Sequence, residues 1–346
     1  KIMAYSSITK PGDYFNTKLY TGNGSTQSIT GVGFQPDWVW SKSRTEARGH
    51  NLNDVVRGST KWLGSNDTSA ELTVATGVTS FDSDGFSLGS SADFNNNTQN
   101  YVSWNWLAGG SASSNTDGSI TSSVSANTTS GFSIVSYSGN GTSGATVGHG
   151  LGSTPKMIIA RKRNTTENWL VYNEAIGNSN ILLLNTTAAS TADNIWTSSP
   201  TSSVFSIHSA DGINGSGGTY IAYCFAEKKG FSEIGSYVGN GNTNGTFVYT
   251  GFKPSFVLVK QSSAAGEDWF ICDTKREGYN GENNRLLPNA SSSESTDSPI
   301  DILSNGFKAR QSGAAVNAAD ATYIYAAFAE HPLVANVSGG LPATAR

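Results

Sequence analysis

The chain has 346 residues, with 22 Lys and Arg against 26 Asp and Glu, so its formal net charge is −4. This balance supplies no basic face for electrostatic nucleic-acid binding, and no nucleic-acid partner is expected. Charged residues make up only 14% of the chain, against about 25% in an ordinary globular protein. No apolar run reaches the ~18 residues of a membrane helix, so no membrane insertion is expected.

Three segments follow the same order of features, which indicates an internal repeat. Each begins with Tyr-x-Gly-Asn-Gly, continues into a short run of apolar residues and closes with an aromatic strand. The Tyr-x-Gly-Asn-Gly motifs occupy residues 20–24, 137–141 and 237–241; the apolar runs occupy 38–40, 157–160 and 256–259; the closing strands occupy 101–106, 220–227 and 323–330.

The local signals along these repeats are those of strands and turns. Gly-Asn-Gly after an alternating run predicts a β-hairpin, because Asn-Gly tolerates the positive φ of a type I′ turn. Asx-Gly-apolar triplets predict three further matched turns, at residues 84–86, 211–213 and 305–307. The best helix candidate is short, residues 173–177.

These signals predict an all-β protein of three tandem β-sandwich modules, jelly-roll or lectin-like, of about 100 residues each. The expected boundaries are 1–110 for the first repeat with its N-terminal leader, 111–230 for the second with a leader strand, 231–332 for the third, and 333–346 for a C-terminal tail. The Ser/Gly-rich residues 109–115 are expected to form a flexible hinge between the first two repeats.

Candidate reaction centres can be tested against the repeat, because a residue that recurs at every matched position is architectural. The segment 82–85 resembles the opening of a calcium loop but lacks its later ligands, so a tight turn is favoured. Glu227 and Glu330 occupy matched strand ends, and Glu174 and Asp273 follow matched strands, so neither pair selects glycoside hydrolysis. No catalytic, cofactor or metal residue is therefore assigned.

Histidine and cysteine give no site either. The four histidines lack the spacing of a metal site. The two cysteines stand outside any CxxC context and are expected to be buried structural thiols. The histidines are His50, His149, His208 and His331, and the cysteines are Cys224 and Cys272.

Four tryptophans allow two interpretations. Trp38 and Trp40 share one face of a strand, as do Trp104 and Trp106, because side chains two apart point the same way. Either pair could form a platform on which sugar rings stack, but a core role is the default for strand aromatics. Repeats 2 and 3 favour the core, because they place Tyr223 and Phe225, then Ala326 and Phe328, where the first has Trp104 and Trp106.

The opening residues 3–24, the motif at residues 33–40 and the ending at residues 323–332 together resemble a repeat family of virion proteins from tailed phages. That family is abundant among marine bacteriophages and is usually labelled tail-fibre-like or lectin-like. The resemblance covers nearly the whole chain, but its motifs are structural and carry over no site residue.

The resemblance implies a non-enzymatic structural protein on the virion surface, as a tail fibre, a spike or a capsid-surface fibre that presents its modules for host attachment. The implied partners are other virion proteins, a host-surface glycan and further copies of the chain, a trimer by analogy with phage fibres. The alternatives are a carbohydrate-binding module array outside a virion and, less favoured, a polysaccharide depolymerase.

Overall fold

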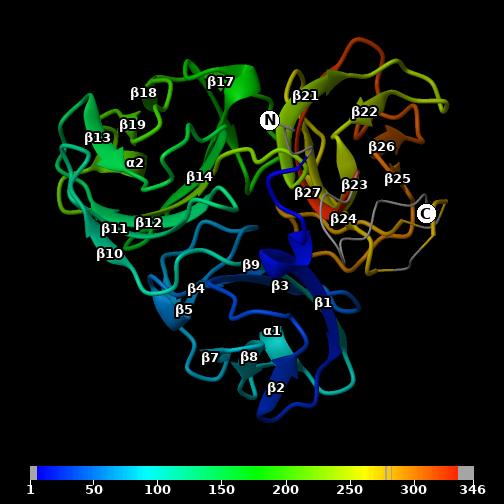
Figure 1. Ribbon diagram of the computed structural model, residues 1–346, viewed down its shortest axis with the longest axis horizontal. Coiled ribbons are helices and arrows are strands. Elements are labelled where there is room, and N and C mark those ends of the chain that lie inside the picture. Colours follow the sequence, from blue (N-terminus) through cyan, green and yellow to red (C-terminus); the bar gives the residue numbers. More distant parts are fainter. Residues whose placement is uncertain (1–5, 277–278, 282, 334–346) are drawn as a thin grey trace, which may run out of the picture.

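The computed structural model describes residues 6–276, 279–281 and 283–333, and its regular structure is almost entirely antiparallel β-sheet (Figure 1). The predicted all-β class is confirmed. The expected tail, apart from Leu333, and the first five residues of the leader lie outside the described residues.

The elements follow in chain order. Repeat 1, here residues 6–110, contains η1 (Pro11–Asp13), β1 (Phe15–Thr21), β2 (Gln27–Thr30), β3 (Trp38–Ser43), β4 (Asn51–Asp54), β5 (Gly58–Leu63), β6 (Leu72–Thr73), β7 (Val78–Asp82), β8 (Gly85–Leu88), α1 (Ala92–Asn95) and β9 (Asn100–Trp106). Repeat 2, residues 111–230, contains β10 (Ser113–Asn115), β11 (Ser122–Asn127), β12 (Phe132–Ser138), β13 (Ala145–Gly148), β14 (Met157–Lys162), β15 (Leu170–Asn173), η2 (Glu174–Ile176), β16 (Asn180–Leu183), β17 (Thr191–Ala192), β18 (Trp196–Ser198), β19 (Val204–Ile207), α2 (Asp211–Asn214) and β20 (Thr219–Phe225). Repeat 3, residues 231–332, contains β21 (Ser232–Val238), β22 (Phe247–Tyr249), β23 (Phe252–Gln261), β24 (Phe270–Asp273), β25 (Ile300–Leu303), β26 (Gly306–Ala309) and β27 (Thr322–Pro332).

The same strand order occurs three times. Each repeat has a large sheet, whose common part runs β1-β9-β3-β4, β12-β20-β14-β15 or β21-β27-β23-β24. Each also has a small sheet of three strands, β2-β8-β7, β13-β19-β18 or β22-β26-β25. The repetition expected from the sequence motifs is therefore present in the strand connectivity, and the exact boundaries between repeats stay a prediction.

Alternation along the strands gives each large sheet two buried faces. In β3, Val39 points into the cluster between the two sheets of its own repeat, whereas Trp38 and Trp40 point to the opposite face. In β14, Ile158 and Ile159 divide in the same way between two clusters. Uninterrupted apolar runs are typical of strands buried on both faces.

The second buried face of each large sheet lies against the other two repeats, and the three lobes surround a common centre (Figure 1). Aromatic rings from different repeats are in direct contact there, with 4.3 Å between the ring centroids of Trp38 and Tyr223 and 5.7 Å between those of Trp106 and Phe328. An apolar cavity of about 10 Å³ remains, lined by matched residues of β3, β14 and β23 and of the three closing strands. These lining residues include Trp38, Met157, Phe256, Trp106, Phe225 and Phe328.

The Gly-Asn-Gly hairpin prediction is wrong. β1 pairs with β9 and β2 pairs with β8, so residues 22–26 cross from the large sheet to the small one. The loop is fixed on the turn of α1: the Tyr20 hydroxyl donates to Phe94 O at 2.9 Å, and a Cβ on Gly22 would lie 2.2 Å from Asn96 O. The same hydroxyl bond recurs from Tyr137 to Ile213 O and from Tyr237 to Val316 O. The motif thus connects the large sheet to the small one, and its recurring tyrosine hydroxyl bond is called the tyrosine clamp below.

The Asx-Gly turn prediction holds twice and fails once. Residues 84–86 and 305–307 lie in the β7–β8 and β25–β26 hairpins, where Asp82 pairs with Gly85 and Leu303 with Gly306. Residues 211–213 instead belong to α2. The register shows that Phe205, opposite Val147, takes the place that Phe86 holds opposite Ile29.

Two smaller expectations had different outcomes. The helix candidate at residues 173–177 is confirmed as the short 3-10 helix η2. The segment expected to be a flexible hinge is held by specific contacts, because Gly109 N donates to Ser125 Oγ at 2.9 Å and Gly110 N to Asp37 Oδ2 at 3.0 Å. Its last residues also form β10, which pairs with β11.

Candidate functional site

The four tryptophans proposed as a sugar platform are buried in the shared core. Trp38, Trp40, Trp104 and Trp106 are 0–2% exposed. The ring of Trp38 stacks on Tyr223 of repeat 2 with an interplanar angle of 18°. The core interpretation is confirmed, and none of these rings offers a face to a sugar in this structure.

A cluster of polar residues lies where repeats 1 and 2 meet, at the end of β4. Asp54 and Arg57 form an ion pair with both side chains fully buried, at 2.5 Å between Oδ2 and Nε. Asp54 also accepts hydrogen bonds from the backbone N–H groups of Val56 and Arg57, so the carboxylate fixes the turn that carries its own partner.

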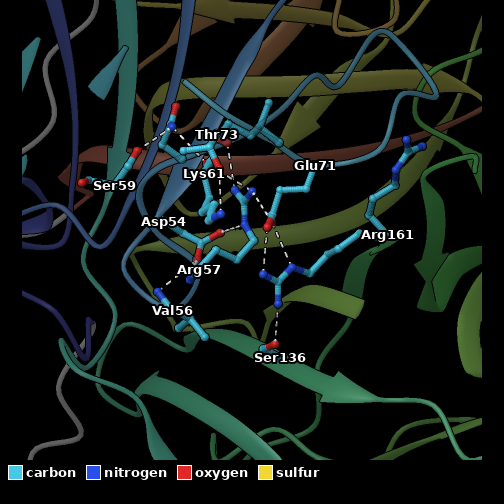
Figure 2. A network of polar contacts seen from close by, with 12 residues as sticks. Asp54, Val56, Arg57, Ser59, Lys61, Glu71, Thr73, Ser136 and Arg161 are labelled. Carbon is cyan, nitrogen blue, oxygen red and sulfur yellow. Dashed lines mark hydrogen bonds and ion pairs between the residues drawn. The ribbon is translucent and has the colours of Figure 1, made fainter. Parts of the chain in front are cut away.

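Glu71 links this pair to repeat 2. Its carboxylate lies between two guanidinium groups, 3.2 Å from Arg57 and 2.9 Å from Arg163, and Arg163 continues to Ser136 Oγ at 3.2 Å (Figure 2). The Tyr223 hydroxyl closes the network by donating to Asp54 Oδ2 at 2.8 Å. Every charge in the cluster therefore has an opposite charge in direct contact.

The electrostatics follow from this pairing. Burial opposes the charge of Arg57, but Asp54 and Glu71 outweigh it, so the pKa of Arg57 lies above its usual value. Burial would raise the pKa of Glu71, but its bonds to Arg163 and Arg57 hold it below the usual value. These groups stay ionised over the physiological range, which suits fixed contacts better than proton transfer.

A matching network lies where repeats 3 and 1 meet. Asp273 and Arg276 are also fully buried, at 2.6 Å, and Arg276 contacts Glu294 at 3.0 Å. Glu294 reaches Arg44 of repeat 1 at 2.8 Å, as Glu71 reaches Arg163. Trp104 Nε1 donates to Asp273 Oδ2 at 3.0 Å, in the place of the Tyr223 hydroxyl. The strand registers equate Asp54 with Asp273 and Trp104 with Tyr223.

The contact between repeats 2 and 3 lacks this network. The register places Asn173 where the other repeats have aspartate, opposite Met157. Its amide oxygen accepts from Ala175 N at 2.9 Å, and Ile176 stands in the position of the arginine. The expected match between Glu174 and Asp273 is therefore one residue out of register.

One hydrogen bond recurs at all three contacts and closes the ring. Trp169 Nε1 of repeat 2 donates to Gly64 O of repeat 1 at 2.7 Å, and Trp269 Nε1 of repeat 3 donates to Leu183 O of repeat 2 at 2.9 Å. His50 Nε2 of repeat 1 lies 2.9 Å from Leu287 O of repeat 3.

The tautomer of His50 follows from its partners. Its Nδ1 accepts from Trp40 Nε1 at 2.9 Å, so the ring proton is on Nε2, which donates to Leu287 O. Burial and the nearby Lys42 hold the pKa of His50 well below its usual value, which keeps the ring neutral. His50 Nε2 thus donates to a carbonyl of the neighbouring repeat, as the indole N–H groups of Trp169 and Trp269 do at the other two contacts.

A buried cation also recurs at one matched strand position in each of the three repeats. Lys42, Arg161 and Lys260 occupy matched positions of β3, β14 and β23 and donate to backbone carbonyls, Arg161 to Ser69 O of the preceding repeat at 2.6 Å. Burial lowers the pKa of Lys42 and of Lys260 to about 8. Figure 2 shows Arg161 beside the Asp54–Glu71 network without a dashed contact to it.

The remaining acidic candidates have structural partners. Lys156 lies 2.9 Å from Glu227 and 3.0 Å from Glu174, and Lys253 lies 3.0 Å from Glu330. In the segment resembling a calcium loop, Asp82 pairs with Gly85 across a two-residue hairpin turn, so the tight-turn interpretation is confirmed. Asp84 in this turn accepts from the backbone N–H groups of Gly31 and Gly33.

The histidines and cysteines add no cluster. No three His, Cys, Asp or Glu side chains within the described residues are grouped to hold a metal ion. His149 is buried, with Nε2 3.2 Å from Thr201 O. Both cysteines are fully buried free thiols, as expected.

The Asp54 and Asp273 networks were missed at the level of the sequence, although a signal exists. Both repeats carry Asp-x-x-Arg, with the aspartate as the last residue of a buried strand. What this arrangement does chemically is to hold neighbouring repeats in register.

The family profile described as "Domain of unknown function (DUF7483)" matches residues 10–332. No curated protein and no solved structure matches the chain. In the part of the chain that the structure describes, no helix is long and apolar enough to cross a membrane.

Proposed function

The chain belongs to the DUF7483 family, and we propose that it is a structural protein of a bacteriophage particle. In this role it lies on the virion surface, as a tail fibre, a spike or a capsid-surface fibre, and presents its repeats for attachment to the host. Other virion proteins and a host-surface glycan are its partners in this proposal.

The observation that supports a structural role is the use made of the repeated residues. The tyrosine clamps, the indole and imidazole contacts to neighbouring carbonyls and the Asp-x-x-Arg pairs all join strands or repeats. The most conspicuous polar clusters are thus engaged in closing the ring, and the shared core is apolar. The resemblance of the motifs to tailed-phage virion proteins supports the proposal that this structural role is on a virion.

The proposal extends to the modules. We infer that each repeat, with its large and small sheets packed face to face, is a β-sandwich of jelly-roll or lectin type. The chain already places three repeats around one centre, so a trimer of chains, expected by analogy with phage fibres, would display nine of them. Such copy number strengthens weak host contacts through multivalency.

Immunogold electron microscopy of purified particles tests the proposal. An antibody against the purified chain should label the tail or the capsid surface of phage that encode it. Particles of the same phage carrying a deletion of the gene provide the control. Absence of label on intact virions that contain the protein by mass spectrometry, or its absence from virions altogether, would overturn the surface location.

A further inference from the structure

The exposed apolar side chains are distributed unevenly over the repeats. Among the described residues, five large apolar side chains are exposed, and four of them lie in repeat 3: Val238, Phe247, Tyr249 and Tyr279; the fifth is Leu72 in repeat 1. Single exposed apolar residues need no explanation, whereas a concentration of them marks a contact surface.

Two of the four, Phe247 and Tyr249, lie on one short strand, β22. They flank the buried Val248 on β22, so both rings point away from the interior on the same face of the small sheet. Their exposed fractions are 43% and 53%. β22 is an edge strand, and Tyr249 lies opposite Gly306.

The fold does not require aromatic residues at these positions. The register equates Phe247 and Tyr249 with Ser28 and Thr30 in β2. It equates them with Thr146 and Gly148 in β13, where the leader also covers the strand, since Ile120 bridges to Val147 and donates its N–H to Thr146 O. The aromatic pair is therefore specific to repeat 3.

Polar groups are fixed beside the rings. Lys308 stands directly opposite Phe247 on the neighbouring strand and therefore on the same face. Its Nζ donates to Asn244 Oδ1 at 2.5 Å. Asn244 is held in turn, because its N–H donates to Asn242 Oδ1 at 2.9 Å. The amide and ammonium groups thus have set positions next to an apolar surface.

We propose that this face of β22 and β26 binds a glycan, with a pyranose ring stacked on Phe247 or Tyr249 and its hydroxyl groups hydrogen-bonded by Lys308 and Asn244. Aromatic faces match the C–H face of a sugar, and a few placed polar groups give orientation. A stable protein partner would need about 20–30 residues on each side, which this small polar-bordered pair does not supply. The inference gives the proposed host attachment its ligand class and rests on that function for its biological role.

Repeat 1 supplies the variant that tests the site. The double substitution Phe247→Ser and Tyr249→Thr gives β22 the side chains that β2 already carries on an equivalent strand, so folding should be kept. Leu72→Ala, which removes the exposed apolar side chain of repeat 1, is the matched control. Thermal unfolding should be the same for the wild-type chain and both variants.

Binding is then measured on an array of neutral and acidic oligosaccharides, with each protein displayed on beads so that weak contacts add. The wild-type chain and Leu72→Ala should bind the same glycans, and the double variant should bind at least about tenfold more weakly. Unchanged binding by the double variant would overturn the site. So would a wild-type chain that binds no glycan.

The array and the particle labelling fail independently. Labelled virions without glycan binding would remove this site and keep the structural proposal. Glycan binding without labelled virions would support the site and contradict the proposed location on the virion surface.

Discussion

The contact between repeats 1 and 2 and the contact between repeats 2 and 3 solve the same packing problem differently. The first joins the fully buried Asp54 and Arg57 to the partly buried Glu71 and Arg163 in a fully paired network. The second has Asn173 in the aspartate position and no arginine. Both retain the apolar core and the indole-to-carbonyl bond. Closure of the ring therefore depends on the apolar core and these neutral bonds, and the charges are an addition at two of the three contacts.

Removing one member of the charged network should show the largest difference between the two contacts. Asp54→Ala leaves the Arg57 guanidinium buried without its closest partner and should lower the free energy of unfolding by about 3–5 kcal/mol. Asn173→Ala, the matched change, loses a neutral hydrogen bond and should cost about 1 kcal/mol. Urea unfolding followed by tryptophan fluorescence measures both, and equal losses would contradict the comparison.

A smaller effect is expected when the Tyr223 hydroxyl, which donates to Asp54 and accepts from Arg57 across the contact, is removed. Tyr223→Phe deletes the hydroxyl that donates to Asp54 and should cost about 1.5–3 kcal/mol, because the acceptor is charged. Tyr137→Phe deletes a neutral bond to Ile213 O within repeat 2 and should cost about 1 kcal/mol. In a double-mutant cycle, Tyr223→Phe and Asp54→Ala should be non-additive. Full additivity would show that the hydroxyl bond contributes nothing specific.

The smallest effect concerns Glu233, a half-buried carboxylate at the contact between repeats 2 and 3. Burial and the nearby Glu227 raise its pKa to about 7. The folded chain then binds a proton more tightly than the unfolded chain, so this group lowers stability as pH rises from about 4.3 to 7. Glu233→Gln should therefore be more stable than the wild-type chain at pH 8, by about 1 kcal/mol or less after solvent screening, and equal to it at pH 4.

Glu71→Gln at the charged contact should behave in the opposite way. The pKa of Glu71 is lowered by its arginines, so its contribution is present above the usual glutamate pKa and is lost as pH falls below it. This variant should be less stable than the wild-type chain at pH 8, with the difference shrinking in acid. Chemical unfolding at pH 4 and pH 8 measures both signs, and the same sign for the two variants would contradict the assignment.

The sequence was sufficient for features that follow from local periodicity and repetition. The apolar runs at residues 157–160 and 256–259 are typical of strands buried on both faces and lie in such strands. The matched aromatic positions favour a core role for Trp104 and Trp106, which are buried. What covers the second face could not be predicted, because the residues that cover it lie in other repeats, far away in sequence.

The errors have identifiable causes. Gly-Asn-Gly supplies positive φ, at +69° in Gly24, but positive φ serves a crossing loop as well as a hairpin. The triplet at residues 211–213 has the same residue types as the other two triplets. The strand register nevertheless places the matching turn of repeat 2 just before Phe205. Exposure of Phe247 and Tyr249 depends on their edge position, which strand order alone decides.

Equilibrium unfolding of the whole chain tests most directly the claim that the three repeats close around one core. Urea unfolding is followed in parallel by tryptophan fluorescence, which reports the shared core, and by far-ultraviolet circular dichroism, which reports the strands of all three repeats. Because the large sheets bury their second faces against one another, the two signals should follow one coincident, cooperative transition. Separate transitions, with one repeat unfolding while the others keep their strands and their fluorescence, would contradict it.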